Sequence, residues 1–186
     1  MSGEPTDITN VDLANPEMHY HEGKLHGPVP QWKYALIVDY GKRYGLKTFF
    51  ETGTCYGWAC EVARHHFDQV YSIELSPKYY SLAVERLHEY PNVHLFQGDS
   101  AKILGAILET TPNVPTLFWL DAHYSCGDTA KGEIDPPLEP ELAAIYEHRP
   151  DAVILIDDQW DVAPEWLGSG RRVENEYGVT RITPRR

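Results

Sequence analysis

Apolar and polar positions follow two alternating patterns along most of the chain. From Gln31 onward, short runs of consecutive apolar residues alternate with longer segments whose apolar residues recur at helical spacing. The short runs are typical of buried strands and the longer segments of amphipathic helices. Strands and helices that alternate in this way favour a parallel sheet with helices on its faces. The pattern therefore predicts an α/β fold with a doubly wound, mainly parallel sheet.

The expected elements follow one another with short connections. Residues 117–120 and 152–156 are apolar throughout, which is typical of central strands covered on both faces. Ser76 followed by Pro77 indicates a helix start, because serine caps helices and proline suits the first helical position. Residues 179–182 are expected to form one edge strand. Helices are predicted at 32–44, 57–67, 77–90, 100–108 and 138–148, and strands at 48–50, 70–75, 93–96, 116–120 and 152–156.

The first part of the chain differs from the rest. Residues 1–30 contain four prolines, and their apolar residues show no period. We interpret residues 1–30 as an irregular N-terminal arm or lid and residues 31–186 as a single domain, a length typical of one domain. His19, His21 and His26 lie in the arm without an acidic or cysteine partner at ligand spacing, so solvated histidines are a simpler interpretation than a metal site.

Composition narrows the classes of partner. The chain has 28 Asp and Glu against 16 Lys and Arg, a formal net charge of −12, which disfavours a nucleic-acid partner. No run approaches the ~20 apolar residues of a membrane span, so no membrane partner is expected. Cys55, Cys60 and Cys126 have no CxxC spacing, and the N-terminus lacks an export pattern. A reducing, cytoplasmic location is therefore expected.

Acidic residues and glycines follow three successive predicted strands. The segment 51–57, ETGTCYG, follows the first strand, Glu74 ends the second, and Gly98-Asp99 follows the third. Ligands of open parallel sheets bind at the carboxyl ends of the strands. Glycines let a backbone approach a ligand, the carboxylate after the second strand can accept hydrogen bonds from ribose hydroxyls, and Asp99 can accept one from an adenine amino group. Each acid alone would more simply cap a helix, but three together favour a nucleoside ligand.

These segments carry a resemblance to a known family. Residues 51–59, 72–74, 98–100 and 120–123 together resemble class I S-adenosylmethionine-dependent methyltransferases, over roughly residues 33–160. The resemblance implies a Rossmann-like, mainly parallel sheet flanked by helices.

Two further features resemble narrower groups of that superfamily. Cys55, where many glycine loops have a middle glycine, is similar to metal-dependent O-methyltransferases of the catechol type. The stretch 119–133 and the pair Asp157-Asp158 resemble macrocin O-methyltransferase-like bacterial enzymes.

The resemblance implies which residues hold the cofactor. S-adenosylmethionine is expected to be held by Gly53, Glu74 and Asp99. The expected cofactor contacts also include neighbours of these residues, namely Glu51, Tyr56, Gly57, Ser100 and Asp121.

The resemblance also implies a divalent cation, expected to be Mg²⁺, held by Asp121, Asp157 and Asp158. Three carboxylates that converge would repel one another and have raised pKa values unless a cation neutralised them. An all-oxygen ligand set suits a hard ion such as Mg²⁺. The alternative is structural: Asp121 caps a loop, and Asp157 and Asp158 begin a turn.

The expected reaction is O-methylation of a hydroxylated small molecule, such as a sugar or another natural product. The cation would lower the pKa of the acceptor hydroxyl, and a nearby base would take its proton. His123 is the first candidate for that base, although it could equally be hydrogen-bonded within its loop, and Lys131 is the second.

The region after Asp158 is short for the helix and antiparallel hairpin that usually complete this family's sheet. A shortened hairpin is therefore expected, with the substrate wall supplied by the N-terminal arm or by a neighbouring subunit of a homo-oligomer. Two other functions stay open: a non-catalytic module that binds S-adenosylmethionine, and a nicotinamide oxidoreductase, which the missing GxGxxG motif disfavours.

Overall fold

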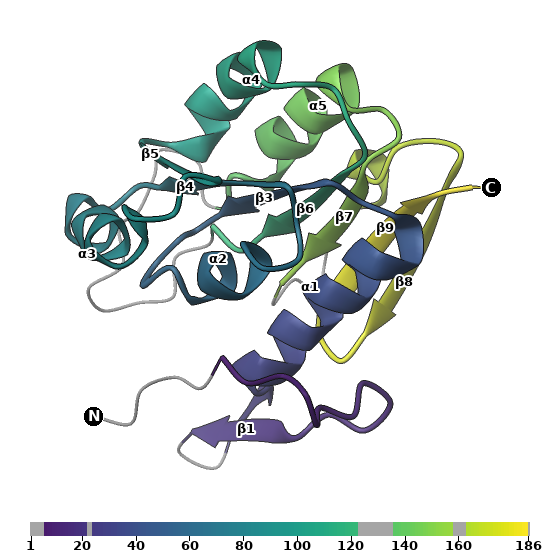
Figure 1. Cartoon of the computed structure of the whole chain (residues 1–186). Coiled ribbons are helices and arrows are strands. Elements are labelled where there is room, and N and C mark those ends of the chain that lie inside the picture. Colours follow the sequence, from purple (N-terminus) through teal and green to yellow (C-terminus); the bar gives the residue numbers. More distant parts are fainter. Residues whose placement is uncertain (1–5, 22–23, 123–135, 158–162, 186) are drawn as a thin grey trace.

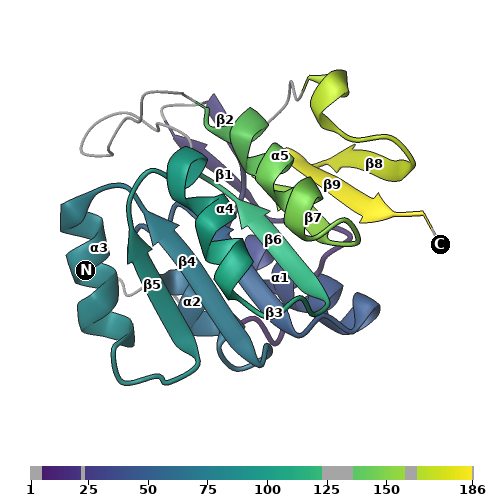
Figure 2. The same cartoon turned by 90° about the horizontal axis from the view of Figure 1, so that it is seen from above.

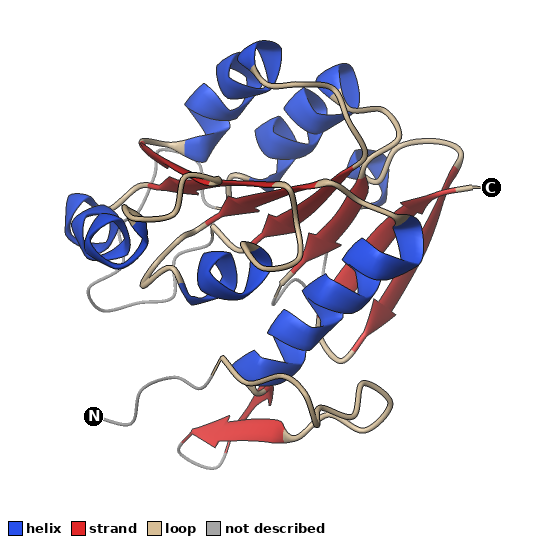
Figure 3. Cartoon of the chain, viewed as in Figure 1, coloured by secondary structure: helices blue, strands red, loops and turns tan. Residues whose placement is uncertain are grey.

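The computed structural model describes residues 6–21, 24–122, 136–157 and 163–185. A seven-stranded sheet crosses the molecule, with helices on both of its faces (Figure 1, and Figure 3 by type of element). The α/β fold with a mainly parallel sheet is therefore confirmed. A separate two-stranded sheet lies beyond the amino end of the first helix (Figure 1).

The order of strands across the sheet is β5-β4-β3-β6-β7-β9-β8. The five strands from β5 to β7 are parallel, whereas β9 runs antiparallel to both of its neighbours. The chain moves outward from β3 through β4 to β5 and then returns to β6 beside β3. The strands are β3 (Thr48–Thr52), β4 (Gln69–Glu74), β5 (Val93–Gln97), β6 (Thr116–Leu120), β7 (Val153–Ile156), β8 (Arg171–Glu176) and β9 (Val179–Pro184).

Helices form one layer on each face of the sheet. Figure 2 shows α4 and α5 side by side across one face, and α1 and α2 lie behind the sheet on the other. Helix α3 lies near the edge strand β5 and its neighbour β4 and packs Leu87 into the core on the α1 and α2 side. The helices are α1 (Pro30–Tyr44), α2 (Trp58–Ala63), α3 (Pro77–Leu87), α4 (Ser100–Thr110) and α5 (Leu138–His148), with a short 3₁₀ turn η1 (Pro164–Trp166).

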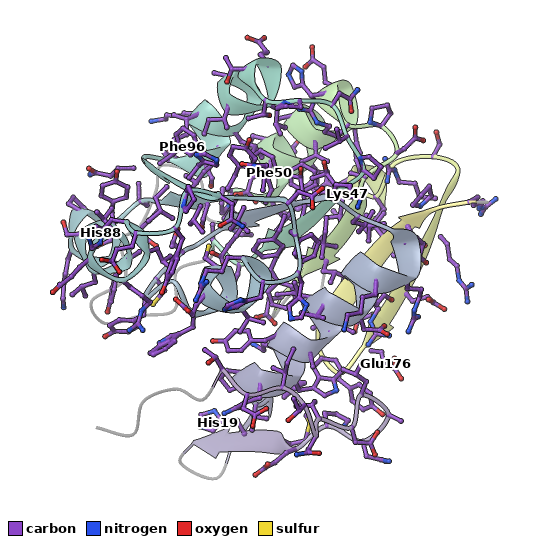
Figure 4. All side chains as sticks on the ribbon, in the orientation of Figure 1. His19, Lys47, Phe50, His88, Phe96 and Glu176 are labelled. Carbon is purple, nitrogen blue, oxygen red and sulfur yellow. The ribbon has the colours of Figure 1, made fainter. Side chains whose placement is uncertain are left out.

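Strand β3 supplies side chains to both cores, because successive residues of a strand point to opposite faces. Phe49 packs near Phe67 in the core under α1 and α2. Phe50 belongs to the core under α4 and α5, where its ring stacks on Tyr71 and Phe118 at centroid distances of 4.6 and 5.2 Å. Figure 4 shows Phe50 between the sheet and these two helices. Both faces of the strand are thus buried, as expected of a central position.

The carboxy-terminal hairpin is complete, in contrast to the shortened one expected from the sequence. Strands β8 and β9 pair from Arg171 with Pro184 to Glu176 with Val179. Residues 179–182, expected at an edge, lie inside the sheet between β7 and β8. The edge strand on this side of the sheet is β8, whose sequence RRVENE is almost entirely exposed. Sequence patterning missed β8 because a charged edge strand has no apolar face to give it a period.

The arm before Pro30 is more regular than expected. Strands β1 (Met18–His21) and β2 (Lys24–Pro28) form an antiparallel pair. The arm is also tied to the main body: the indole N–H of Trp32 donates to the carbonyl of Leu13 at 3.3 Å, and the hydroxyl of Tyr177 donates to the carbonyl of Ala14 at 2.9 Å. Its role as a lid stays a prediction.

In the described ranges, no helix combines the length and the apolar character needed to cross a membrane.

Candidate functional site

The carboxyl ends of β3, β6 and β7 lie next to one another. Thr52 pairs with Leu120 at the ends of β3 and β6. Beyond the paired residues, the N–H of Asp121 donates to the carbonyl of Thr52 at 3.0 Å, and the N–H of Asp157 donates to that of Leu120 at 3.0 Å. Asp121 and Asp157, which the sequence predicted to converge, therefore follow adjacent strands.

The glycine loop after β3 approaches the end of β6 closely. Gly53 has φ of +90°, and a Cβ atom there would lie 2.5 Å from the carbonyl oxygen of Asp121. Only glycine fits both this dihedral angle and this space. Gly57 also has positive φ, at 78°, and its α-carbon faces Leu87 of α3 so closely that a Cβ would meet that side chain at 2.8 Å. The sequence ETGTCYG therefore folds as a tight turn that holds β3, β6 and α3 together.

Glu74 fastens this loop to the end of β4. One carboxylate oxygen accepts the N–H of Cys55 at 2.8 Å, and the other accepts the N–H of Ser76 at 2.7 Å. The side chain is buried. Because a carboxylate oxygen can accept two hydrogen bonds, each oxygen keeps one acceptor position beyond its backbone partner. Glu74 is thus fixed in orientation by two backbone hydrogen bonds, and whether it also contacts a ligand stays a prediction.

Glu51 lies beneath the loop and is almost completely buried. Its Oε2 accepts the hydroxyl of Ser72 at 2.7 Å and the thiol of Cys60 at 3.0 Å. Burial raises the pKa of Glu51 to about 7, although the bonds from Cys60 and Ser72 oppose the shift. Its immediate partners are thus protein side chains, which indicates that Glu51 supports the loop from inside.

Asp99 is the N-cap of α4. Its Oδ1 accepts the N–H of Ala101 at 3.1 Å, and Lys102 lies 3.7 Å from its other carboxylate oxygen. This is the capping role that the sequence left open, and the second oxygen forms an ion pair with Lys102. Ser100 beside it is buried. Whether Asp99 and Ser100 also contact a ligand stays a prediction.

Tyr56, another expected cofactor contact, is 45% exposed and borders the cavity that Asp121 and Asp157 line. Its ring meets that of Tyr79 edge-on at 5.2 Å.

Glu141 is a buried acid that sequence reasoning missed. It lies in the first turn of α5 with 1% of its surface exposed, and its Oε1 has no hydrogen-bond partner among the described residues. Burial raises its pKa to about 7; a hydrogen bond from Ser100 opposes the shift and the charge of Asp99 adds to it. An acid in a first turn normally indicates only a favourable interaction with the helix dipole. The sequence therefore contained no signal that Glu141 is buried.

A cavity of about 200 Å³ lies between the glycine loop and the ends of β6 and β7. Asp121 and Asp157 line it, together with Lys33 from the first turn of α1. The Nζ atom of Lys33 lies 2.6 Å from Oδ2 of Asp157, whose side chain is only 2% exposed. The cavity therefore already contains one neutralised acid.

Several predicted residues cannot be placed. Asp158, His123 and Lys131 lie outside the described residues. Within the described parts, no three His, Cys, Asp or Glu side chains are arranged to hold a metal ion. The three-carboxylate site thus stays a prediction. Two of its three residues, Asp121 and Asp157, belong to the described part of the chain. Of the three histidines in the arm, His19 is exposed on β1 (Figure 4).

Known proteins of similar sequence give little functional information. No model of a known protein family matches the chain. An uncharacterized protein of Methanocaldococcus jannaschii, MJ1452, is 31% identical over 91 residues, which is 42% of this chain and 35% of that protein.

Solved structures resemble the chain over most of its length. The SAH-bound methyltransferase PaMTH1 of Podospora anserina covers 85% of the chain and 80% of its own length, with a TM-score of 0.62 and 15% identity. The O-methyltransferase TomG of Streptomyces achromogenes, in complex with SAM, covers 84% of this chain and 82% of its own length. Its TM-score is 0.64 and its sequence identity 16%. The chain has the class I methyltransferase fold. The resemblance predicted from the sequence is therefore confirmed at the level of the fold.

The methyltransferase fold does not identify the acceptor atom. A precorrin-6y C5,15-methyltransferase of Geobacter metallireducens also matches, at a TM-score of 0.56 and 16% identity, over 82% of this chain and 86% of its own. Proteins with this fold thus include more than O-methyltransferases, and the acceptor must be argued from the site.

The close approach at Gly53 predicts a large effect of one methyl group. Gly53→Ala should lower the free energy of unfolding by about 2–4 kcal/mol, because it combines a strained φ with a clash against the Asp121 carbonyl. Urea unfolding followed by tryptophan fluorescence measures this. Gly105→Ala is the matched control. Gly105 lies in α4, where an added Cβ atom would be 3.8 Å from its nearest neighbour, so this substitution should stabilise the protein slightly. Equal stability of Gly53→Ala and wild type would contradict the described approach.

Glu141 predicts a pH dependence of stability. Between pH 4.5 and 7 the unfolded chain releases this proton while the folded protein keeps it, so stability falls as pH rises through this range. The loss attributable to Glu141 is about 3 kcal/mol, complete above pH 7. About 2.5 kcal/mol of this loss falls between pH 5 and pH 8, so the unfolding free energies at these two pH values should differ by that much less in Glu141→Gln than in wild type. Glu139→Gln, an exposed neighbour in the same turn, should keep the wild-type profile, and an unchanged profile of Glu141→Gln refutes the assignment.

Proposed function

We propose that the protein is an S-adenosylmethionine-dependent methyltransferase that acts on a hydroxyl oxygen of a small molecule. The observation that carries this proposal is the orientation of Glu74. Both of its carboxylate oxygens are fixed by backbone N–H groups, at 2.8 and 2.7 Å, and both retain capacity for a further hydrogen bond. A buried carboxylate at the end of the strand next to the glycine loop matches the ribose-binding arrangement of dinucleotide folds.

The remaining cofactor contacts are assigned by their position around Glu74. Asp99 and Ser100 follow the neighbouring strand β5, where they would meet the adenine. Gly53 and Asp121 face each other at the ends of β3 and β6, where the backbone comes close enough to border the methionine part. Glu51 would act from below by holding the loop, and Tyr56 and Gly57 complete the turn.

The proposed reaction is an in-line displacement. S-adenosylmethionine supplies a methyl group on a positively charged sulfur, which makes it a good leaving group. The acceptor oxygen forms a bond to the methyl carbon while the carbon–sulfur bond breaks, and the hydroxyl proton passes to a base. His123 and Lys131 are proposed for that base. The protein contributes mainly by holding the oxygen and the methyl group in line and in contact.

A divalent cation, proposed as Mg²⁺, would be held by Asp121, Asp157 and Asp158. The donor chemistry fits: Asp121 and Asp157 offer carboxylate oxygens to one cavity, and hard ions prefer oxygen. Such an ion would lower the pKa of a bound acceptor hydroxyl. Lys33 already contacts the carboxylate of Asp157, so an ion bound to Asp157 would lie close to the ammonium group of Lys33.

The cavity favours a small acceptor. Its volume of about 200 Å³ is bordered by Tyr34, Trp58 and Trp119, which supply apolar surface beside the two carboxylates. We propose a hydroxylated sugar or another natural product as the acceptor class. A net charge of −12 makes a nucleic-acid acceptor unfavourable.

The non-catalytic alternative loses its main support. It rested on a carboxy-terminal region too short to complete the sheet, whereas β8 and β9 complete it. No observation of the described residues favours a binding module over an enzyme.

Calorimetric titration tests the cofactor proposal. The protein should bind S-adenosylmethionine and S-adenosylhomocysteine with dissociation constants on the order of micromolar, about −8 kcal/mol. Glu74→Gln should weaken both at least about tenfold, because an amide cannot replace both acceptor oxygens, and hydrogen bonds to a charged group contribute about 1.5–3 kcal/mol. Glu109→Gln, an exposed acid of α4, is the control that should bind like wild type.

The same titration separates the rival functions. Binding of NADH in place of both nucleotides would indicate an oxidoreductase. If neither S-adenosylmethionine nor S-adenosylhomocysteine binds, the proposed function is ruled out. Circular dichroism of Glu74→Gln establishes that its fold is intact, so that a loss of affinity is attributed to the missing contact.

A further inference from the structure

Lys33 occupies an unusual position at the start of α1. The amino end of a helix carries partial positive charge, so lysine in the first turn is unfavourable and acidic residues are preferred there. The first turn of α1 contains no acid, and Lys33 is its charged residue. Its ammonium group turns instead to Asp157, 124 positions away in the sequence, at 2.6 Å. Asp157 thus compensates for the unfavourable placement of Lys33.

The ion pair lies in the proposed reaction cavity and not on a remote surface. Lys33, Asp157 and Asp121 all line the same space of about 200 Å³. Lys33 retains 17% exposure of its side chain, whereas Asp157 has 2%. A buried carboxylate needs compensating positive charge, and the ammonium group of Lys33 supplies such charge to Asp157 at 2.6 Å.

We propose that Lys33 is a built-in cation of the acceptor site, which competes with a divalent metal ion for Asp157. This inference rests on the metal-assisted function proposed above, and it adds a regulator of that site. A metal ion that binds Asp157 must share or displace the ammonium group, and the two positive charges repel each other across a few ångströms. Lys33 therefore weakens metal binding and neutralises Asp157 when no metal ion is bound.

The competition has a consequence for the acceptor. With the metal absent, the ammonium group remains in the cavity and can donate hydrogen bonds to an acceptor oxygen. With the metal bound, the ammonium group is released from Oδ2 of Asp157. Lys33 is thus a positioning residue that determines which cation faces the acceptor.

Binding of Mn²⁺, followed through the electron paramagnetic resonance signal of the free ion, tests the competition without any acceptor. Lys33→Met should bind Mn²⁺ at least about tenfold more tightly than wild type, because one repelling charge is gone. Asp157→Asn should abolish binding in either background. Lys47→Met is the matched control: this exposed lysine pairs with Asp68 at 3.9 Å, outside the cavity, and should leave the Mn²⁺ affinity unchanged.

Equal affinity of wild type and Lys33→Met would overturn the inference, and so would the absence of binding in both. Either result leaves the titrations with S-adenosylmethionine unaffected, so failure of this inference is distinct from failure of the proposed cofactor function.

A second measurement uses the wild-type lysine itself, in case Lys33→Met does not fold. Lysines methylated with ¹³C-formaldehyde keep their charge and give separate signals, and the Lys33 signal is identified by its loss in Lys33→Arg. Addition of Mg²⁺ should shift the Lys33 signal with the same midpoint as Mn²⁺ binding and leave Lys47 in place. A Lys33 signal that stays constant at saturating Mg²⁺ refutes the competition.

Discussion

The close approach of Gly53 to the Asp121 carbonyl is the constraint on which the candidate site depends. It brings the glycine loop after β3 against the end of β6, and the parallel register places Asp157, the residue after β7, beside that end. Glu74 holds the other side of the loop through the N–H of Cys55. A loop fixed on both sides by backbone contacts presents its carboxylates to a ligand with little reorganisation, which favours tight and oriented binding.

Buried negative charge is the main electrostatic difficulty of this end of the sheet, and each acid is accommodated in a different way. Glu74 is stabilised by two backbone N–H groups, and Asp157 by the ammonium group of Lys33. Glu51 and Glu141 have pKa values raised to about 7 by burial, so near neutral pH each is partly protonated. Hydrogen bonds, an ion pair and a raised pKa are thus three different ways in which this end of the sheet accommodates its acids.

Much of the fold follows from sequence patterning. The strand at 116–120 and the helix at 138–148 have the boundaries expected, because each is a strongly apolar or amphipathic segment between clear turn signals. The acids at strand ends were also predicted to gather, since parallel strands end at one edge. The charged edge strand β8 was not predicted, because a strand open to water has no apolar face. The contact of Lys33 with Asp157 and the burial of Glu141 were missed because both depend on tertiary packing.

The bond between Tyr177 and Ala14 joins segments 163 positions apart, and both flank Trp32 of α1. The ring of Tyr177 also meets the indole of Trp32 edge-on at 5.6 Å. On the ribosome, α1 is synthesised long before the β8–β9 turn that covers it. Contacts so distant in sequence form late, because the entropy of closing the intervening chain must first be overcome. The indole of Trp32 is therefore covered only after residue 177 has been synthesised, and until then this corner would expose apolar surface to chaperones.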